Sequence, residues 1–449
     1  MSNVKLLIIA LFALAAAACR KDFSGIREPK RRVDSTKVYR IPSTSGDSLL
    51  VDNLRKVTDV LKELYKKRVN LKLVNAAIFA KVYTDESILL KDLIYPEKSR
   101  LQGSASFQTY VQKCNTSLDQ FSHDFWGEAE KKGDPAFMGF LKRLNNAGAS
   151  ARSGSFSNSN IGELEASIYF PYSEGFPPPE EGHYEPITSL VTATADADEG
   201  WGSQPYYING ILQSYVQVLI NDDYAYSNPT QIVGVNGVEP YTATTATNSI
   251  FPPGEPVDLP SLTREVKQVY IGEVRVNGHQ YDHLISFTGN GGGSEIRFTR
   301  ADGFLKVVDG QVQTADVYFT PAREISRNDI KHARNVDFSV EWDGDWEASN
   351  LQQNLGIYEE DNRNTSTFNG SLSTTVTATL TPVTVTAVRT LGFTINYKSD
   401  DELIRQLNFN RDVFFTLNHT NLEGEMRNGW PVRDRQGPVS YTLSDRTYY

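Results

Sequence analysis

Cysteine is scarce in this chain of 449 residues, which contains only Cys19 and Cys114. So few cysteines exclude a disulfide framework, and the folded state must draw its stability from buried apolar surface. Histidine is also rare, with six residues. Neither a Gly-x-Ser-x-Gly nucleophile motif nor a phosphate-binding P-loop occurs in the sequence. The sequence therefore contains no assembled catalytic motif of these kinds.

An excess of basic charge is also absent. The 45 Lys and Arg residues are outnumbered by 55 Asp and Glu residues, which gives a net charge of −10. Because nucleic-acid binding needs positive charge to neutralise phosphates, this balance argues against a nucleic-acid partner. The 39% hydrophobic and 22% charged residues fit a globular protein, and the length predicts two or three domains.

Long apolar runs are missing except at the N-terminus. Lys5 precedes an apolar run at residues 6–14, and small residues at 16–18 lead directly to Cys19. These features predict a secretory signal at residues 1–18, too short for a comfortable membrane span. A cysteine directly after the small residues resembles a bacterial lipoprotein signal, which implies cleavage before Cys19 and lipid on Cys19. The alternative is an ordinary secretory signal in which Cys19 is incidental.

The lipoprotein resemblance has consequences for location. Arg20 follows Cys19, where some bacterial lipoproteins held at the inner membrane have an aspartate. The resemblance therefore implies an outer-membrane protein that faces the surface or the periplasm. Since no later apolar run is long enough to span a bilayer, the lipid anchor would be the only membrane attachment. Residues 19–48, rich in charge, Ser, Thr and Pro, are predicted to be a tether.

The region 49–146 is predicted to be mainly helical. Its clearest helix has apolar residues on one face, with charged residues elsewhere. These apolar residues are Val51, Leu54, Val57, Leu61 and Leu64. Residues 71–81 fit a helix or a strand, residues 88–94 fit a short helix before Pro96, and two more helices are expected at 108–125 and 135–144.

The rest of the chain is predicted to be rich in β-strands. The middle region, 162–240, has strand patterns at 166–172, 190–194 and 215–220, and a hairpin signal at Asn236-Gly237. Within it, residues 218–230 resemble uncharacterised surface lipoproteins of Gram-negative bacteria, a resemblance that carries no assigned activity.

Short alternating strands continue through residues 263–449, after a proline-containing linker at 241–262. Strands at this spacing predict an antiparallel β-sandwich. Together with the helical region, they give an α+β fold class.

One acidic motif stands out in this β-rich region. An alternating strand at 355–358 runs into Glu359 and Asp361, and Glu295 opens another strand. This arrangement resembles the strand and calcium loop of C2 domains over residues 266–398, although glutamate stands where aspartate is usual and the neighbouring proline is missing. The resemblance implies a C2-like sandwich that binds calcium through Glu295, Glu359 and Asp361. Calcium takes six to eight oxygen ligands, so other groups would have to contribute. The alternative is a solvated acidic loop.

Tryptophans beside acidic residues form a second candidate site. Trp342 and Trp346 flank an acidic turn, and Trp201 follows an acidic segment. Exposed rings of this kind could stack on a sugar, whereas buried rings would belong to the core. The alternation around Trp342 favours burial. His279 and His283 are four residues apart but lack the glutamate of a His-Glu-x-x-His zinc site, so packed or solvent-facing histidines are favoured.

These observations favour a lipid-anchored protein with a non-catalytic binding or structural role at the outer membrane. Its partner would be an envelope protein or a glycan. The alternative is a surface glycoside hydrolase or peptidase that uses carboxylates which the sequence alone cannot pair. A deep cleft with two facing carboxylates would favour the enzyme, and a shallow face would favour binding.

Overall fold

The computed structural model describes most of the chain after residue 44. The described residues are 45–83, 86–145, 166–178, 188–208, 211–235, 264–287, 291–302, 307–308, 311–312, 317–348, 350, 352–359, 365–380, 383–398, 402–421 and 424–448. The predicted signal, Cys19 and most of the tether lie outside these residues, as do Asp361 and the Asn236-Gly237 turn. The tether predicted at residues 19–48 is wrong at its end, because residues 45–48 begin helix α2. The described part has a mixed α+β class, as predicted.

Helices dominate the first hundred described residues. They are α2 (Ser45–Leu64), α3 (Arg68–Phe79), α4 (Leu90–Ile94), η1 (Pro96–Lys98), η2 (Arg100–Gly103), α5 (Ala105–Cys114), α6 (Leu118–Lys131) and α7 (Pro135–Leu144). The apolar face predicted for α2 is confirmed, because all five of its residues are buried. Polar caps start the later helices. Ser117 accepts a hydrogen bond from the backbone of Gln120 at the start of α6, and Asp134 caps α7 in the same way.

A six-stranded mixed sheet packs with these helices. Its strands are β1 (Ser87–Leu89), β2 (Ala166–Tyr169), β3 (Ser189–Thr192), β4 (Glu199–Ile208), β5 (Ile211–Asn221) and β6 (Thr230–Val235), in the order β1-β2-β6-β3-β4-β5. Strands β3 and β6 are parallel, and the other neighbours are antiparallel. The short helix predicted at 88–94 is wrong in its first two residues, because Ile88 pairs with Ile168 of β2 and extends the sheet.

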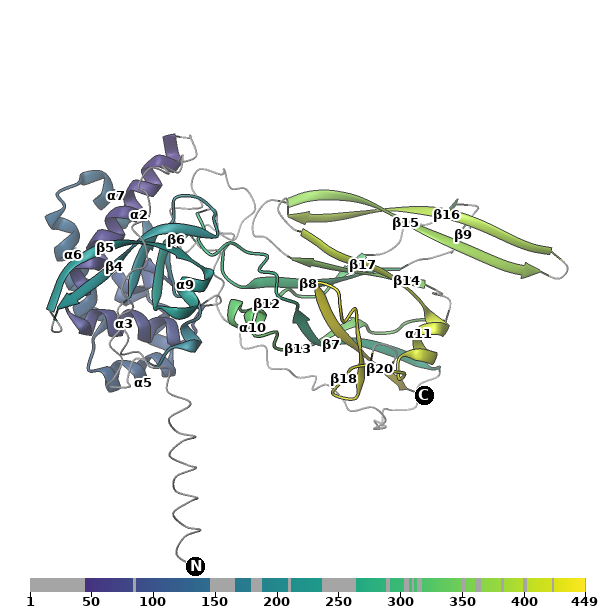
Figure 1. Cartoon of the computed structure of the whole chain (residues 1–449). Coiled ribbons are helices and arrows are strands. Elements are labelled where there is room, and N and C mark those ends of the chain that lie inside the picture. The colour runs from purple at the N-terminus through teal and green to yellow at the C-terminus, as the bar shows by residue number, and fades with distance from the viewer. Residues whose placement is uncertain are drawn as a thin grey trace, which may run out of the picture. The chain divides into compact units, whose positions relative to one another are not determined.

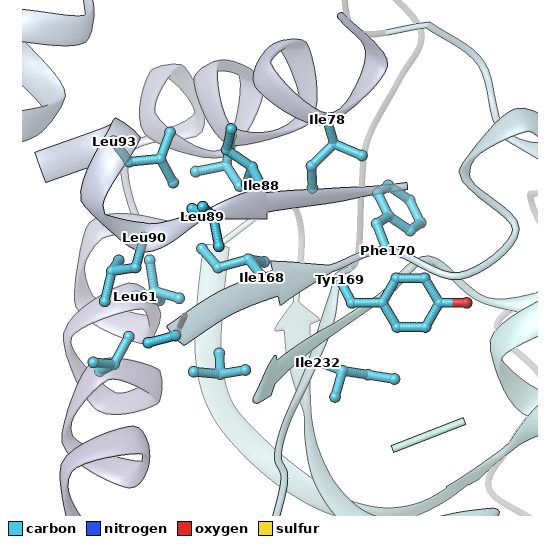
Figure 2. Packing of buried hydrophobic residues seen from close by; sticks show 14 of the residues in the cluster. Leu61, Ile78, Ile88, Leu89, Leu90, Leu93, Ile168, Tyr169, Phe170 and Ile232 are labelled. Atoms are coloured by element: carbon cyan, nitrogen blue, oxygen red, sulfur yellow. The ribbon is translucent and has the colours of Figure 1, made fainter. Parts of the chain in front are cut away.

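The helices and this sheet share one hydrophobic core. Helix α2 lies against β3 and β6. Leu61 belongs to the same cluster of buried residues as Ile88, Ile168 and Ile232 (Figure 2). Buried polar groups join the same layers, since Gln231 of β6 donates a hydrogen bond of 2.9 Å to Asn75 of α3. The helical region and the β-rich middle region therefore have one core between them. We call the described residues 45–235 the α/β lobe; it also contains η3 (Ser173–Gly175) and α9 (Asp222–Ser227).

Residues 264–448 form a sandwich of two antiparallel sheets (Figure 1). One sheet has the order β13-β7-β20-β19-β18 and consists of β7 (Val266–Val276), β13 (Val336–Asp343), β18 (Met426–Arg427), β19 (Trp430–Arg433) and β20 (Val439–Tyr448). The other has the order β11-β8-β14-β17, with β12 also on β8. It consists of β8 (Ser294–Asp302), β11 (Val317–Phe319), β12 (Arg323–Ile325), β14 (Gln352–Glu359) and β17 (Glu402–Asn410).

Alternate residues of both sheets form the second core. Ile271 of β7 and Tyr441 of β20 come from one sheet, and Phe298 of β8 and Ile357 of β14 come from the other. The inward and outward alternation that predicted these strands thus places every second residue in a common interior. We call the described residues 264–448 the sandwich lobe. It also contains α10 (Arg327–Lys331), α11 (Arg411–Leu417) and a short pair formed by β9 (Val307–Val308) and β10 (Gln311–Val312).

Between β14 and β17 of the second sheet, the chain forms a long two-stranded ribbon. Its strands are β15 (Thr365–Leu380) and β16 (Val383–Lys398), and they pair along their whole length (Figure 1). Neither strand pairs with any other strand in the described part of the chain. We call this pair the ribbon.

Candidate functional site at the junction of the two cores

One loop connects the two cores. Residues 277–293, between β7 and β8, are here called the junction loop; residues 288–290 lie outside the described part. Leu284, Ile285 and Phe287 of this loop belong to the core of the α/β lobe, although the flanking strands belong to the sandwich core. The backbone of Ile285 exchanges two hydrogen bonds of 2.9 Å with Ala197. The sandwich lobe thus inserts apolar residues into its neighbour.

Glycines in the α/β lobe allow this close approach. A Cβ atom on Gly234 would lie 2.5 Å from the carbonyl oxygen of Ser286, and one on Gly200 would lie 2.6 Å from Cδ1 of Ile285. Both distances are below van der Waals contact. Larger residues at these positions would push the junction loop away from the strands that receive it.

Arg327 of α10 holds the two ends of the junction loop. Its side chain is only 2% exposed. The guanidinium donates hydrogen bonds to the backbone carbonyls of Asp282, at 2.8 Å, and Gly292, at 3.2 Å. It also donates to the carboxylate of Asp222 in α9, at 3.0 Å. A planar guanidinium has enough donors to bind all three groups at once.

The electrostatics of this contact favour the ionised pair. Burial alone would raise the pKa of Asp222, but the positive charge of Arg327 and the hydrogen bonds from Tyr172 and Arg327 lower it. Tyr172 donates to the second carboxylate oxygen at 2.6 Å. Lys331, one turn after Arg327, donates to Asp223 at 3.0 Å. Helix α10 is therefore fixed to α9 by several charged hydrogen bonds.

Three carboxylates gather beside this contact. Asp282 of the junction loop, Glu295 of β8 and Glu359 of β14 each present an oxygen within 4.8 Å of the others. Asp282 is 3% exposed and Glu359 is 1% exposed, whereas Glu295 is partly exposed. Pairing between β8 and β14 brings the last two together, since Glu359 lies opposite Ile296 in the register. We call these residues the acidic cluster.

The acidic cluster differs from the predicted calcium site in one member. Glu295 and Glu359 come together, whereas Asp361 lies outside the described residues, and Asp282 takes the third place. Sequence reasoning missed Asp282 because it lies 77 positions from Glu359 and reaches the cluster only through the fold of the junction loop. Three carboxylates supply part of the oxygen set that calcium takes, and water or backbone carbonyls would have to complete it.

The predicted tryptophan site is not formed as a ligand platform. Trp342 and Trp346 are fully buried in the sandwich core, with ring centroids 5.8 Å apart. Their indole N–H groups donate to the carbonyls of Thr299 and Asn350, at 3.1 and 2.7 Å. Both rings are therefore structural, in agreement with the alternation around Trp342. Trp201 is half-buried on β4, opposite Leu219 of β5.

His279 and His283, for which packed or solvent-facing positions were favoured, have different neighbours. The ring of His283 lies 3.1 Å from the carboxylate of Asp198, and His279 packs edge-on against Tyr281 with centroids 4.6 Å apart. Among the described residues, the acidic cluster is the group of potential metal ligands that meets in space.

A further buried carboxyl group, that of Glu86, lies in the α/β lobe. It accepts hydrogen bonds from the backbone of Tyr172 and the hydroxyl of Ser173, both at 2.9 Å. Burial raises the pKa of Glu86 to about 7, an effect that the hydrogen bond from Ser173 opposes and the charges of Glu174 and Glu324 reinforce. Glu174 in turn pairs with Lys81 at 2.6 Å and accepts a hydrogen bond from Asn328 at 3.4 Å.

The described surface also carries an open pocket of about 490 Å³ near the start of α6. It is lined by Val69, Asn115, Thr116, Ser117, Asp119, Gln120 and His123. Asp119 is the only carboxylate among these lining residues, so this pocket does not present a facing pair of acids.

In comparisons with known proteins, no family model, curated protein or solved structure matches the chain. None of the helices in the described part is both long and apolar enough to cross a bilayer.

The calcium hypothesis predicts a stabilisation that depends on the acidic cluster. Three converging carboxylates repel one another, and a cation bound only by the folded state would relieve that repulsion. Calcium should therefore raise the melting temperature of the wild type relative to a chelator, and the double variant Asp282→Asn, Glu359→Gln should lose this difference. The measurement is a pair of melting curves for each protein.

The matched control replaces exposed acids in the same way, with Asp119→Asn and Glu341→Gln. This control should keep the calcium response of the wild type. An unchanged melting temperature of the wild type in saturating calcium would remove the calcium hypothesis and leave an acidic structural contact.

Proposed function

We propose that the chain is a lipid-anchored envelope protein with a non-catalytic binding or structural role at the outer membrane. The single observation that carries this proposal is the N-terminal pattern, in which an apolar run and small residues end directly at Cys19. A lipidated Cys19 would hold the two lobes near the membrane through a tether formed by the residues between Cys19 and the start of α2 at Ser45. An envelope protein or a glycan is the expected partner.

The non-catalytic role is supported by where the described acids lie. A glycoside hydrolase or a carboxylate peptidase needs two carboxyl groups that face a substrate in a cleft. Asp282 and Glu359 are close together but buried, so a polymeric substrate could not reach them. The open pocket near α6 has Asp119 as its only acidic lining residue.

The alternative function, a surface glycoside hydrolase or peptidase, keeps one observation in its favour. Carboxylate oxygens of Asp282 and Glu359 lie within 4.8 Å of each other, close enough for the two groups to share a proton or to act on the same substrate. An enzyme of this kind would require the junction loop to move and expose Asp282. Hydrolysis of an envelope glycan or peptide that Asp282→Asn abolishes would favour this alternative.

Replacing Cys19 tests the anchor. Without its thiol, residue 19 cannot carry lipid, so Cys19→Ala should release soluble protein or leave an uncleaved precursor. The measurement is detergent phase partitioning of cell fractions combined with the apparent mass of the chain. Cys114→Ala is the matched control and should stay in the detergent phase, since Cys114 lies in the folded α5. A processed Cys19→Ala protein that still partitions wholly into detergent would contradict the anchor.

A further inference from the structure

Three arginines of the sandwich lobe converge on one carboxylate. Glu425, directly before β18, lies 2.9 Å from Arg427 and 3.3 Å from Arg435, measured between a guanidinium nitrogen and a carboxylate oxygen. Arg275 of β7 lies 3.8 Å from the carboxylate oxygen that Arg427 also contacts. We call these four residues the arginine cluster. They come from β7, from the β18–β19 hairpin and from the loop after β19, so only the fold brings them together.

Two of the three guanidinium groups are held in place by neighbouring polar groups. Arg427, whose side chain is 3% exposed, also donates to the hydroxyl of Ser440 at 3.1 Å. Arg275 donates to the side-chain oxygen of Asn277 at 2.9 Å, and Asn277 donates to the carbonyl of Gly437 at 2.6 Å. Because these arginines are fixed before a ligand arrives, a ligand that contacts them loses little free energy to the ordering of side chains.

The outer side of the arginine cluster is open to solvent. The side chain of Arg435 is 49% exposed, that of Glu425 is 27% exposed and that of Arg275 is 21% exposed. An ion in solution can therefore reach these guanidinium groups from the surface, while the buried Arg427 adds its charge from below.

Positive charge exceeds negative charge within the arginine cluster. Its three guanidinium groups and one carboxylate leave an excess of two positive charges. Burial lowers the pKa of Arg275, and the positive charges of Arg427 and Arg435 lower it further, although the carboxylate opposes them. The Nη1 nitrogen of Arg427 is buried and has no hydrogen-bond partner in the described part of the chain. The next carboxylate on β7, that of Glu273, accepts a hydrogen bond of 2.9 Å from an asparagine. A second anion at the cluster would therefore relieve repulsion between its arginines.

From this arrangement we propose that the arginine cluster binds a phosphate group carried by a sugar of an envelope glycan. The planar fork of a guanidinium group matches the oxygens of phosphate and is more weakly hydrated than an ammonium group. A phosphate monoester has a charge of about −1.5 to −2 at pH 7, which complements the excess of positive charge, whereas a carboxylate would supply only one charge. The inference rests on the proposed binding role and gives its glycan partner a recognisable group.

Glu425 gives the site a property that a purely structural set of ion pairs would lack. Its carboxylate contacts the guanidinium groups that a phosphate would bind, so the two negative groups repel one another. Glu425→Gln removes this charge and keeps the size of the side chain and one acceptor oxygen. The variant should therefore bind phosphate at least about 10-fold more tightly than the wild type. In a structural cluster, the same change would lower stability without strengthening phosphate binding.

The test is isothermal titration calorimetry of the chain from Arg20 onward, without lipid, at constant ionic strength. The probes are glucose 6-phosphate, inorganic phosphate and unmodified glucose, and the wild type should bind the two phosphates and not glucose. The variant Arg275→Gln, Arg435→Gln should weaken phosphate binding by at least about 10-fold. The control variant Arg323→Gln, Arg334→Gln removes two positive charges elsewhere in the sandwich lobe and should bind phosphate like the wild type.

Several outcomes would overturn the proposal. They are a wild type that binds neither phosphate at millimolar concentration, an unchanged affinity in Glu425→Gln, and equal weakening by both arginine double variants. Binding of inorganic phosphate alone would replace the glycan with the free ion. A wild type that does not bind glucose 6-phosphate but floats with vesicles that contain phosphatidic acid would replace it with a lipid headgroup. Because the chain tested lacks Cys19, the result is independent of whether the proposed anchor exists.

Discussion

Replacing Arg327 with alanine is expected to lower the free energy of unfolding by about 3–5 kcal/mol, the usual cost of removing one partner of a buried ion pair. The substitution leaves the carboxylate of Asp222 without its closest charged donor, although Lys331 remains 3.5 Å away. It also removes both hydrogen bonds to the ends of the junction loop. Urea unfolding followed by fluorescence measures the loss.

Arg334→Ala is the matched control, because Arg334 follows the same helix but is half exposed. Its ion pair with Asp329 spans 3.3 Å. An exposed pair of this kind contributes about 0–1 kcal/mol, so this variant should unfold almost like the wild type. Equal losses for the two variants, or a loss below about 1 kcal/mol for Arg327→Ala, would contradict the role given to the buried arginine.

The second large effect is a pH dependence that originates at Glu86. The pKa of this carboxyl is about 7 in the folded chain and about 4.5 when unfolded. The folded state therefore binds the proton more tightly than the unfolded state does. Protonation of Glu86 adds its whole contribution to the free energy of unfolding below pH 4.5, and this contribution is lost as the pH rises through about 7. The amount is about 3 kcal/mol, from about 1.4 kcal/mol for each pH unit.

The variant Glu86→Gln isolates this contribution, because other carboxyls titrate in both proteins. Lys81, Glu174 and Glu324 act on Glu86 and are unchanged in the variant. Between pH 8 and pH 5, the wild type should gain stability relative to Glu86→Gln when both are unfolded in urea. The control variant Glu130→Gln changes an exposed carboxyl group, so its free energy of unfolding should change with pH as that of the wild type does. Parallel curves for wild type and Glu86→Gln would show that the carboxyl has an ordinary pKa.

Local patterns predicted much of the fold. The spacing from Val51 to Leu64 was enough to place the buried face of α2, because a helix repeats every 3.6 residues whatever it packs against. The strand at Ile88 was missed because its state is decided by pairing with Ile168, 80 positions away. The pattern of residues 88–94 alone fits a helix equally well, and only the sheet settles the matter.

The junction was harder to predict for the same reason. Glu295 and Glu359 could be associated in advance, since each lies at the end of a recognisable strand. Asp282 and Arg327 lie in a loop and a short helix, and nothing in the local sequence indicates which distant groups they meet. The apolar residues Leu284, Ile285 and Phe287 were the available signal, because three apolar residues in a loop need a core to cover them.

The most direct test of the proposed anchor is mass spectrometry of the N-terminus of the chain purified from membranes. The lipoprotein account predicts that the mature chain begins at Cys19 and that its first tryptic peptide, Cys19-Arg20, carries the added mass of acyl chains. A mature N-terminus at any other residue, or an unmodified Cys19 in the membrane-bound chain, would contradict the account.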